Sequence, residues 1–107
     1  MSASRPFTET QLEMLKDPEL AAMYLEEALA EGDMELFKTA LKNVADARVG
    51  GMTALSRETD LNREHLYRLL SDKGNPTLDT LTKLLDALGL RIAVRPAAAS
   101  QNVKAYP

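Results

Sequence analysis

A chain of 107 residues with 45% apolar and 27% charged side chains has the size and composition of one folded domain. It contains no cysteine, which excludes disulfides, thiol nucleophiles and cysteine-ligated metals. No apolar run reaches the roughly 18–20 residues of a membrane-spanning helix, and the first residues lack the order of a signal peptide. We therefore expect a cytoplasmic protein without a membrane partner.

The net charge of −3 is unevenly distributed along the chain. Residues 1–41 carry three cations and nine acids, a net charge of −6. Residues 42–95 carry nine cations and seven acids, a net charge of +2. The two halves are therefore expected to meet different partners, although the split is too modest to identify a DNA-binding protein by itself.

Three helices are expected in the acidic half. A short one is placed near residues 10–15. Asp17-Pro18-Glu19 then begins a helix that runs to about Glu31, because Asp caps free N–H groups and Pro is tolerated in the first turn. Asp33 is the expected cap of the next helix, which runs to about Ala47.

The apolar residues of these helices recur at helical spacing and are expected to face one core. Methionines are expected to fill the same core rather than to form a cofactor site. The expected buried residues are Leu20, Met23, Tyr24 and Ala28 in the first long helix, Leu36, Phe37, Ala40, Leu41, Val44 and Ala47 in the second, and the methionines Met14, Met34 and Met52.

The basic half begins after Gly50-Gly51 with two short helices, 53–59 and 62–70, separated only by Asp60-Leu61. Thr77 then caps a last helix, which Gly89 ends. Its expected apolar stripe consists of Leu78, Leu81, Leu84, Leu85 and Leu88.

Beyond Gly89, apolar residues alternate with polar ones from Leu90 to Arg95, which predicts a half-buried strand. A strand needs a hydrogen-bonded partner. The partner is either the segment 5–8 or the same strand of a second subunit. Residues 96–107 have no pattern and are expected to form a flexible tail.

The helix 62–70 carries the most informative pattern. On a wheel of about 100° per residue, Tyr67 lies about 40° from Arg63, Arg68 about 140° and Leu66 about 300°. Glu64 and Ser71 share the arc of the two arginines, and Leu69 shares the leucine arc. Exposed charges on a helix are by themselves usually only solvated surface. Two short helices joined by a tight turn are nevertheless the arrangement that places a helix in the major groove.

The segments Met52–Ser71 and Gly74–Leu90 together resemble the Xre/Cro/phage-repressor helix-turn-helix family. Within it, the chain is most similar to the probable addiction-module antidote proteins, and Asp17-Pro18-Glu19 with Glu31-Gly32-Asp33 extends the similarity to roughly residues 15–95. Asp60 departs from the family, which usually has Gly in this turn. If the position requires a positive φ, Asp is among the residues that tolerate it.

The resemblance implies an all-α fold with a lambda-repressor-like helix-turn-helix core of about five helices, to which the predicted C-terminal strand adds. It also implies an antitoxin that represses its own two-gene operon and neutralises a small basic toxin of the RelE/ParE type. On this interpretation residues 1–32 are an N-terminal extension with an acidic helix, and residues 33–95 are the DNA-binding domain.

The expected partners are operator DNA, the toxin and a second copy of the chain. A dimer would contact two half-sites of a palindromic operator about 34–36 Å apart. Arg can bind guanine, Glu can accept from cytosine, and Tyr can donate to a phosphate or lie against a thymine methyl. The expected phosphate contacts are Thr53, Arg57 and Lys73, and the residues expected to read or position bases are Asn62, Arg63, Glu64, Tyr67 and Arg68.

No catalytic, cofactor or metal site is expected. His65 is the single histidine and is assigned to packing at the edge of the buried arc, because zinc requires several N or S ligands. Two alternatives to the antitoxin remain open: a stand-alone repressor without a toxin, and an interaction module that has lost DNA binding. An enzyme is the least favoured interpretation, because nothing in the sequence places a nucleophile and an acid around His65 to form a catalytic site.

Overall fold

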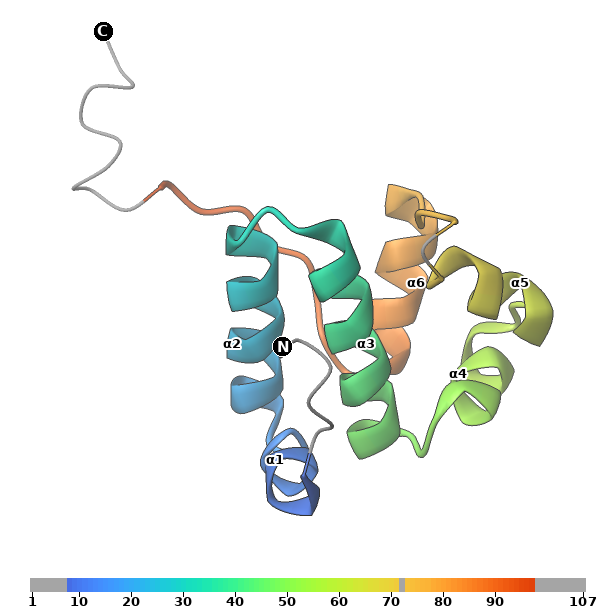
Figure 1. The fold of residues 1–107 in the computed structure, drawn as a ribbon, viewed down its shortest axis with the longest axis horizontal. Coiled ribbons are helices and arrows are strands. Elements are labelled where there is room, and N and C mark those ends of the chain that lie inside the picture. The colour runs from blue at the N-terminus through green and yellow to red at the C-terminus, as the bar shows by residue number, and fades with distance from the viewer. Residues whose placement is uncertain (1–7, 72, 98–107) are drawn as a thin grey trace, which may run out of the picture.

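Six helices form over the residues that the computed structural model describes, 8–71 and 73–97. They are α1 (Glu9–Met14), α2 (Pro18–Ala30), α3 (Met34–Arg48), α4 (Met52–Thr59), α5 (Arg63–Leu69) and α6 (Leu78–Ala87). Helices α2 and α3 lie side by side, α6 follows beyond α3, and α4 and α5 stand at the far edge (Figure 1). The expected all-helical class is confirmed, as is the short helix near residues 10–15.

Short polar side chains begin these helices where the sequence predicts them. Asp17 Oδ1 accepts from the backbone N–H of Glu19 at 2.8 Å, and Asp33 Oδ1 does the same for Glu35 at 3.0 Å. Thr77 Oγ1 accepts from the N–H of Thr80 at 3.2 Å. Each cap satisfies a donor that the first helical turn leaves free.

A single apolar core joins the acidic and the basic half of the chain. Helix α3 lies at its centre and contacts α1, α2 and α4. Arg48, the last residue of α3, also donates to the carbonyl oxygens of Leu88 at 2.6 Å and of Lys16 at 2.7 Å. The core side chains from α2 to α6 are Ala21, Leu25, Ala28, Phe37, Ala40, Leu41, Val44, Ala45, Met52, Leu55, Leu66, Leu84 and Leu85.

Several residues expected in this core are exposed instead. Met23 is 58% exposed because the buried stripe of α2 is Ala21, Leu25 and Ala28, and Met23 lies about 200° around the helix from Ala21. Leu78 is 70% exposed because it stands on the first turn of α6, whose buried residues are Leu84 and Leu85. The expectation of burial was also wrong for Met14, Met34 and Leu36.

The strand predicted for Leu90–Arg95 is not formed, and the described residues contain no strand. The N–H of Leu90 donates to the carbonyl oxygen of Leu85 at 2.8 Å, which closes the end of α6. Residues 91–96 form no backbone–backbone hydrogen bond with any described residue, since the described part of the chain supplies no neighbouring strand. Residues 5–7 of the expected partner lie outside the described residues, and Thr8 caps α1. Pairing with a second subunit stays a prediction.

None of the helices in the described part of the chain combines the length and the apolar character needed to cross a bilayer.

Candidate nucleic-acid interface

Helices α4 and α5 are joined by three residues whose conformation explains the tight turn. Asp60 has a φ of +62°, in the left-handed region, so this position does require the positive φ that Asp tolerates. Thr59 Oγ1 donates to the carbonyl of Leu55 at 2.8 Å and accepts from the N–H of Leu61 at 3.3 Å. Asn62 Oδ1 accepts from the N–H of His65 at 3.1 Å and caps α5. The turn is therefore fixed by its own side chains.

Helix α5 separates its apolar and polar residues as the wheel predicts, although Leu69 is only half-buried. Leu66 is fully buried. Tyr67 is 46% exposed, and Arg63, Glu64 and Arg68 are exposed as well. Ser71 differs from the prediction, because it is half-buried and its Oγ donates to the carbonyl of Arg68 at 2.8 Å.

The exposed side chains of α5 are organised among themselves. The Arg63 guanidinium lies 5.4 Å from the centroid of the Tyr67 ring, within the range of a cation–π contact. Arg68 Nη2 lies 3.1 Å from His65 Nδ1, which acts as the acceptor because a guanidinium can only donate. His65 is half-buried, which agrees with its expected place at the edge of the buried arc.

The predicted phosphate contacts lie in the segments before and after α5 in the chain. Thr53 and Arg57 are exposed on α4, which packs against α5, and Lys73 is exposed in the turn after α5. Within the described ranges, no carboxylate forms an ion pair with Arg57, Arg63, Arg68 or Lys73. These four cations therefore keep their charge available to an external anion.

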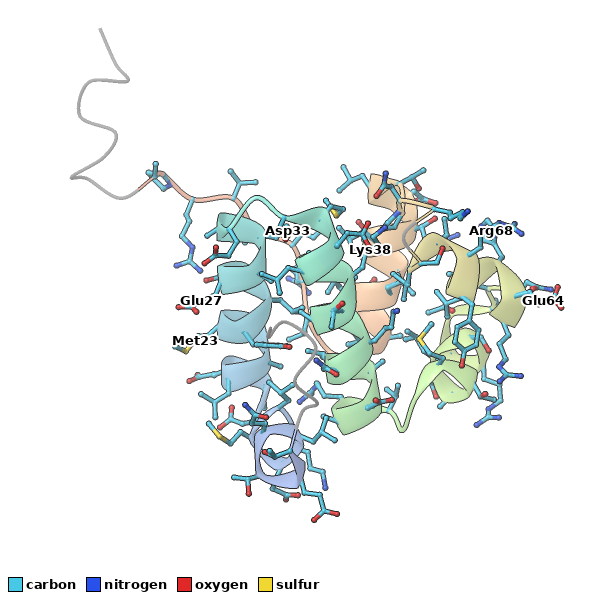
Figure 2. The ribbon with its side chains drawn as sticks, viewed as in Figure 1. Met23, Glu27, Asp33, Lys38, Glu64 and Arg68 are labelled. Atoms are coloured by element: carbon cyan, nitrogen blue, oxygen red, sulfur yellow. The ribbon has the colours of Figure 1, made fainter. Side chains whose placement is uncertain are left out.

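At the edge of the molecule opposite α5, the outer face of α2 exposes mainly acidic side chains. Figure 2 shows Met23 and Glu27 projecting outward from α2, away from Glu64 and Arg68 on α5. Glu19, Glu26 and Glu27 are exposed around Met23 on the outer face of α2. Glu26 is paired with Arg95, whose Nη2 lies 2.5 Å from Glu26 Oε2. A shallow groove of about 330 Å³ between α1 and α2 is lined by Met14, Leu20, Met23 and Tyr24 among others.

Sequence reasoning missed Lys38, which is 1% exposed on α3. Its Nζ donates to the carbonyl oxygens of Ser71 and Gly74, both at 2.5 Å, and lies 2.9 Å from Glu35 Oε2. A signal was present in the sequence, because Leu41 and Ala45 follow Lys38 at the i+3 and i+7 spacing of a buried stripe. A lysine at such a position needs polar partners inside the fold.

The chain matches known proteins in two comparisons. A family model described as "Probable addiction module antidote protein" matches residues 6–96. An uncharacterized protein of Haemophilus influenzae is 40% identical over 83 residues, which are 78% of this chain and 84% of that protein. No solved structure matches. The family match covers most of the described residues, including α5 and the acidic outer face of α2. The chain therefore belongs to the family of probable addiction module antidote proteins.

Proposed function

We propose that this antidote protein binds operator DNA through α4 and α5, acting as a helix-turn-helix, and so represses its own operon. The observation that carries the proposal is the exposed arc of Arg63, Tyr67 and Arg68 over the buried Leu66. A helix of this kind can enter the major groove while its apolar side stays seated on the protein.

The chemistry of the arc suits base edges and phosphates. Each arginine can donate two hydrogen bonds to guanine O6 and N7, and Glu64 can accept from cytosine N4. Thr53, Arg57 and Lys73, which are all exposed, are proposed to contact the sugar–phosphate backbone and to set the register of α5. No carboxylate of the described chain forms an ion pair with Arg63 or Arg68, which favours this proposal over a merely solvated surface.

The proposed DNA-binding form is a homodimer on a palindromic operator. Support comes from exposed apolar side chains of α2, α6 and the segment after α6: Leu29 is 52% exposed, Leu78 70% and Ile92 38%. They border a groove of about 250 Å³ that Phe37 and Leu85 also line. Contiguous exposed apolar surface commonly marks a protein interface. A chain that remains monomeric at high concentration, yet binds DNA tightly, would contradict the dimer.

The proposed second partner is a basic toxin of the RelE/ParE type. Membership of an antidote family supports a toxin partner. The outer face of α2 fits such a partner, because an exposed methionine stands among glutamates. Methionine adapts its shape to a binding partner, and carboxylates favour a cationic one. This face lies at the edge opposite α5, so DNA and toxin can be held together (Figure 2).

A gel shift with the DNA upstream of the chain's own gene tests the proposal, with and without the product of the adjacent gene. We expect a salt-sensitive shift by the chain alone and a further shift when the adjacent product is added. No shift at low salt would favour the interaction module that has lost DNA binding. A shift that the adjacent product neither changes nor joins would favour a stand-alone repressor.

A further inference from the structure

Lys38 is the one buried charged residue among those that the structure describes. It lies on α3, outside the pair of helices assigned to DNA (Figure 2). Burying an ammonium group is costly unless its protons are all bonded. Its burial is therefore explained only by the groups that it holds.

The ammonium of Lys38 has an acceptor for each of its three protons. Two are the carbonyl oxygens of Ser71 and Gly74, at 2.5 Å each, and the third is Glu35 Oε2 at 2.9 Å. Both carbonyls belong to the chain that directly follows α5, 33 and 36 residues beyond Lys38. A side chain of the central helix thus fixes the turn after α5.

That turn is folded closely onto the last turn of α5. Ser71 Oγ donates to the carbonyl of Arg68 at 2.8 Å and accepts from the N–H of Lys73 at 3.2 Å. A Cβ atom on Gly74 would lie 2.5 Å from the carbonyl oxygen of Arg68, so the backbone approach there requires glycine. The position of Lys73 relative to Arg68 therefore depends on the two carbonyls that Lys38 holds.

We propose that Lys38 is a positioning residue for DNA binding, an inference that rests on the proposed function. By holding the Ser71 and Gly74 carbonyls against α3, it places the exposed ammonium of Lys73 beside the groove that α5 enters. Lys73 then contacts a phosphate while Arg68 reaches the bases. Lys38 itself stays buried and does not touch DNA.

The test uses the salt dependence of binding, which counts phosphate contacts. Loss of one contact lowers the slope of log K against log salt by about 1. Fluorescence anisotropy with labelled upstream DNA over a salt series would compare wild type, Lys73→Ala, Lys38→Met and the double variant. We expect each single variant to bind roughly tenfold more weakly and to lose about 1 from the slope. The double variant should lose no more slope than either single variant.

A matched control separates positioning from general destabilisation. Arg57→Ala removes a predicted phosphate contact on α4, so its slope loss should add to that of Lys38→Met. Gly74→Ala displaces the same turn from its other side and should reproduce the slope of Lys38→Met. If Lys38→Met does not fold, Gly74→Ala is measured in its place. The slope of log K against log salt is then expected to fall by about 1 in Gly74→Ala.

A wild-type slope in Lys38→Met, with a reduced slope in Lys73→Ala, would overturn this inference and leave the proposed function intact. Slope losses that add in the double variant would overturn it in the same way. A wild-type slope in Lys73→Ala would remove the contact that Lys38 is proposed to position. Wild-type protein that does not bind the upstream DNA would overturn the proposed function and this inference together.

Discussion

Helices α2 and α5 stand at opposite edges of the molecule and pack against the same core, yet their outer faces differ in the sign of most of their charges. Helix α2 buries Ala21, Leu25 and Ala28 and exposes Met23 among glutamates. Helix α5 buries Leu66 and exposes two arginines and a tyrosine. The comparison teaches that the fold constrains only the inner faces. Each outer face is free to bind a partner of its own. Substitutions on α5 and on α2 can therefore be tested separately.

The largest effect on stability is expected from shortening the buried side chain of α5. Leu66→Ala should destabilise the protein by about 2–5 kcal/mol, because the side chain is fully buried between α5 and the core. Urea unfolding followed by circular dichroism measures it. Leu36→Ala is the matched control, since Leu36 is 44% exposed on α3 and its loss should change stability by less than about 1 kcal/mol. Equal effects of the two substitutions would contradict the assigned burial.

The outer face of α5 should govern DNA alone. Arg63→Ala and Arg68→Ala are each expected to weaken specific operator binding by about 1–3 kcal/mol, because each removes donors to base edges. Anisotropy titration with operator and with unrelated DNA measures the loss. Lys83→Ala removes an exposed cation on α6, outside the proposed interfaces, and serves as control. Unchanged operator affinity in both α5 variants would count against the assignment.

The outer face of α2 should govern the toxin alone. Met23→Ala is expected to weaken toxin binding by more than about 1 kcal/mol, because an apolar anchor inside a charged rim is a common energetic centre of an interface. Titration calorimetry with the co-purified toxin measures it. Met34→Ala removes a methionine that is 44% exposed on α3 and should have little effect. Loss of operator binding in Met23→Ala would contradict the claim that the outer face of α2 does not take part in DNA binding.

The smallest effect concerns the start of α5. Asn62→Ala removes the side-chain cap on the N–H of His65 and should cost about 1 kcal/mol of stability in the absence of DNA. Thermal unfolding measures the change, with Asn75→Ala as an exposed control outside any helix. An unchanged melting temperature in Asn62→Ala would show that the cap contributes nothing to α5.

Local chemistry made much of the fold predictable. Asp17, Asp33 and Thr77 begin helices because their side chains satisfy nearby N–H groups, a property that needs no tertiary contact. The two faces of α5 were predictable for a similar reason, since leucines and arginines alternate with the helical period. The left-handed conformation of Asp60 did not follow from the residue itself, because only the glycine usual in the resembled family at this turn raised the possibility.

Other features depend on which elements pack together, and periodicity alone does not specify them. Met23 fits an apolar stripe as well as Leu25 does, but only one face of α2 meets α3. Lys38 is buried because two carbonyls more than thirty residues away converge on it. The alternation of Leu90–Arg95 predicted a strand, but the described residues supply no strand with which it could pair.

The central claim is that the exposed arc of α5 lies against DNA and the outer face of α2 does not. Photo-crosslinking tests it directly, with p-benzoylphenylalanine incorporated in place of Tyr67 or of Met23 and with labelled upstream DNA. The account predicts a crosslink to DNA from position 67 and none from position 23. A crosslink from position 23, or none from position 67 while the protein still binds that DNA, would contradict it.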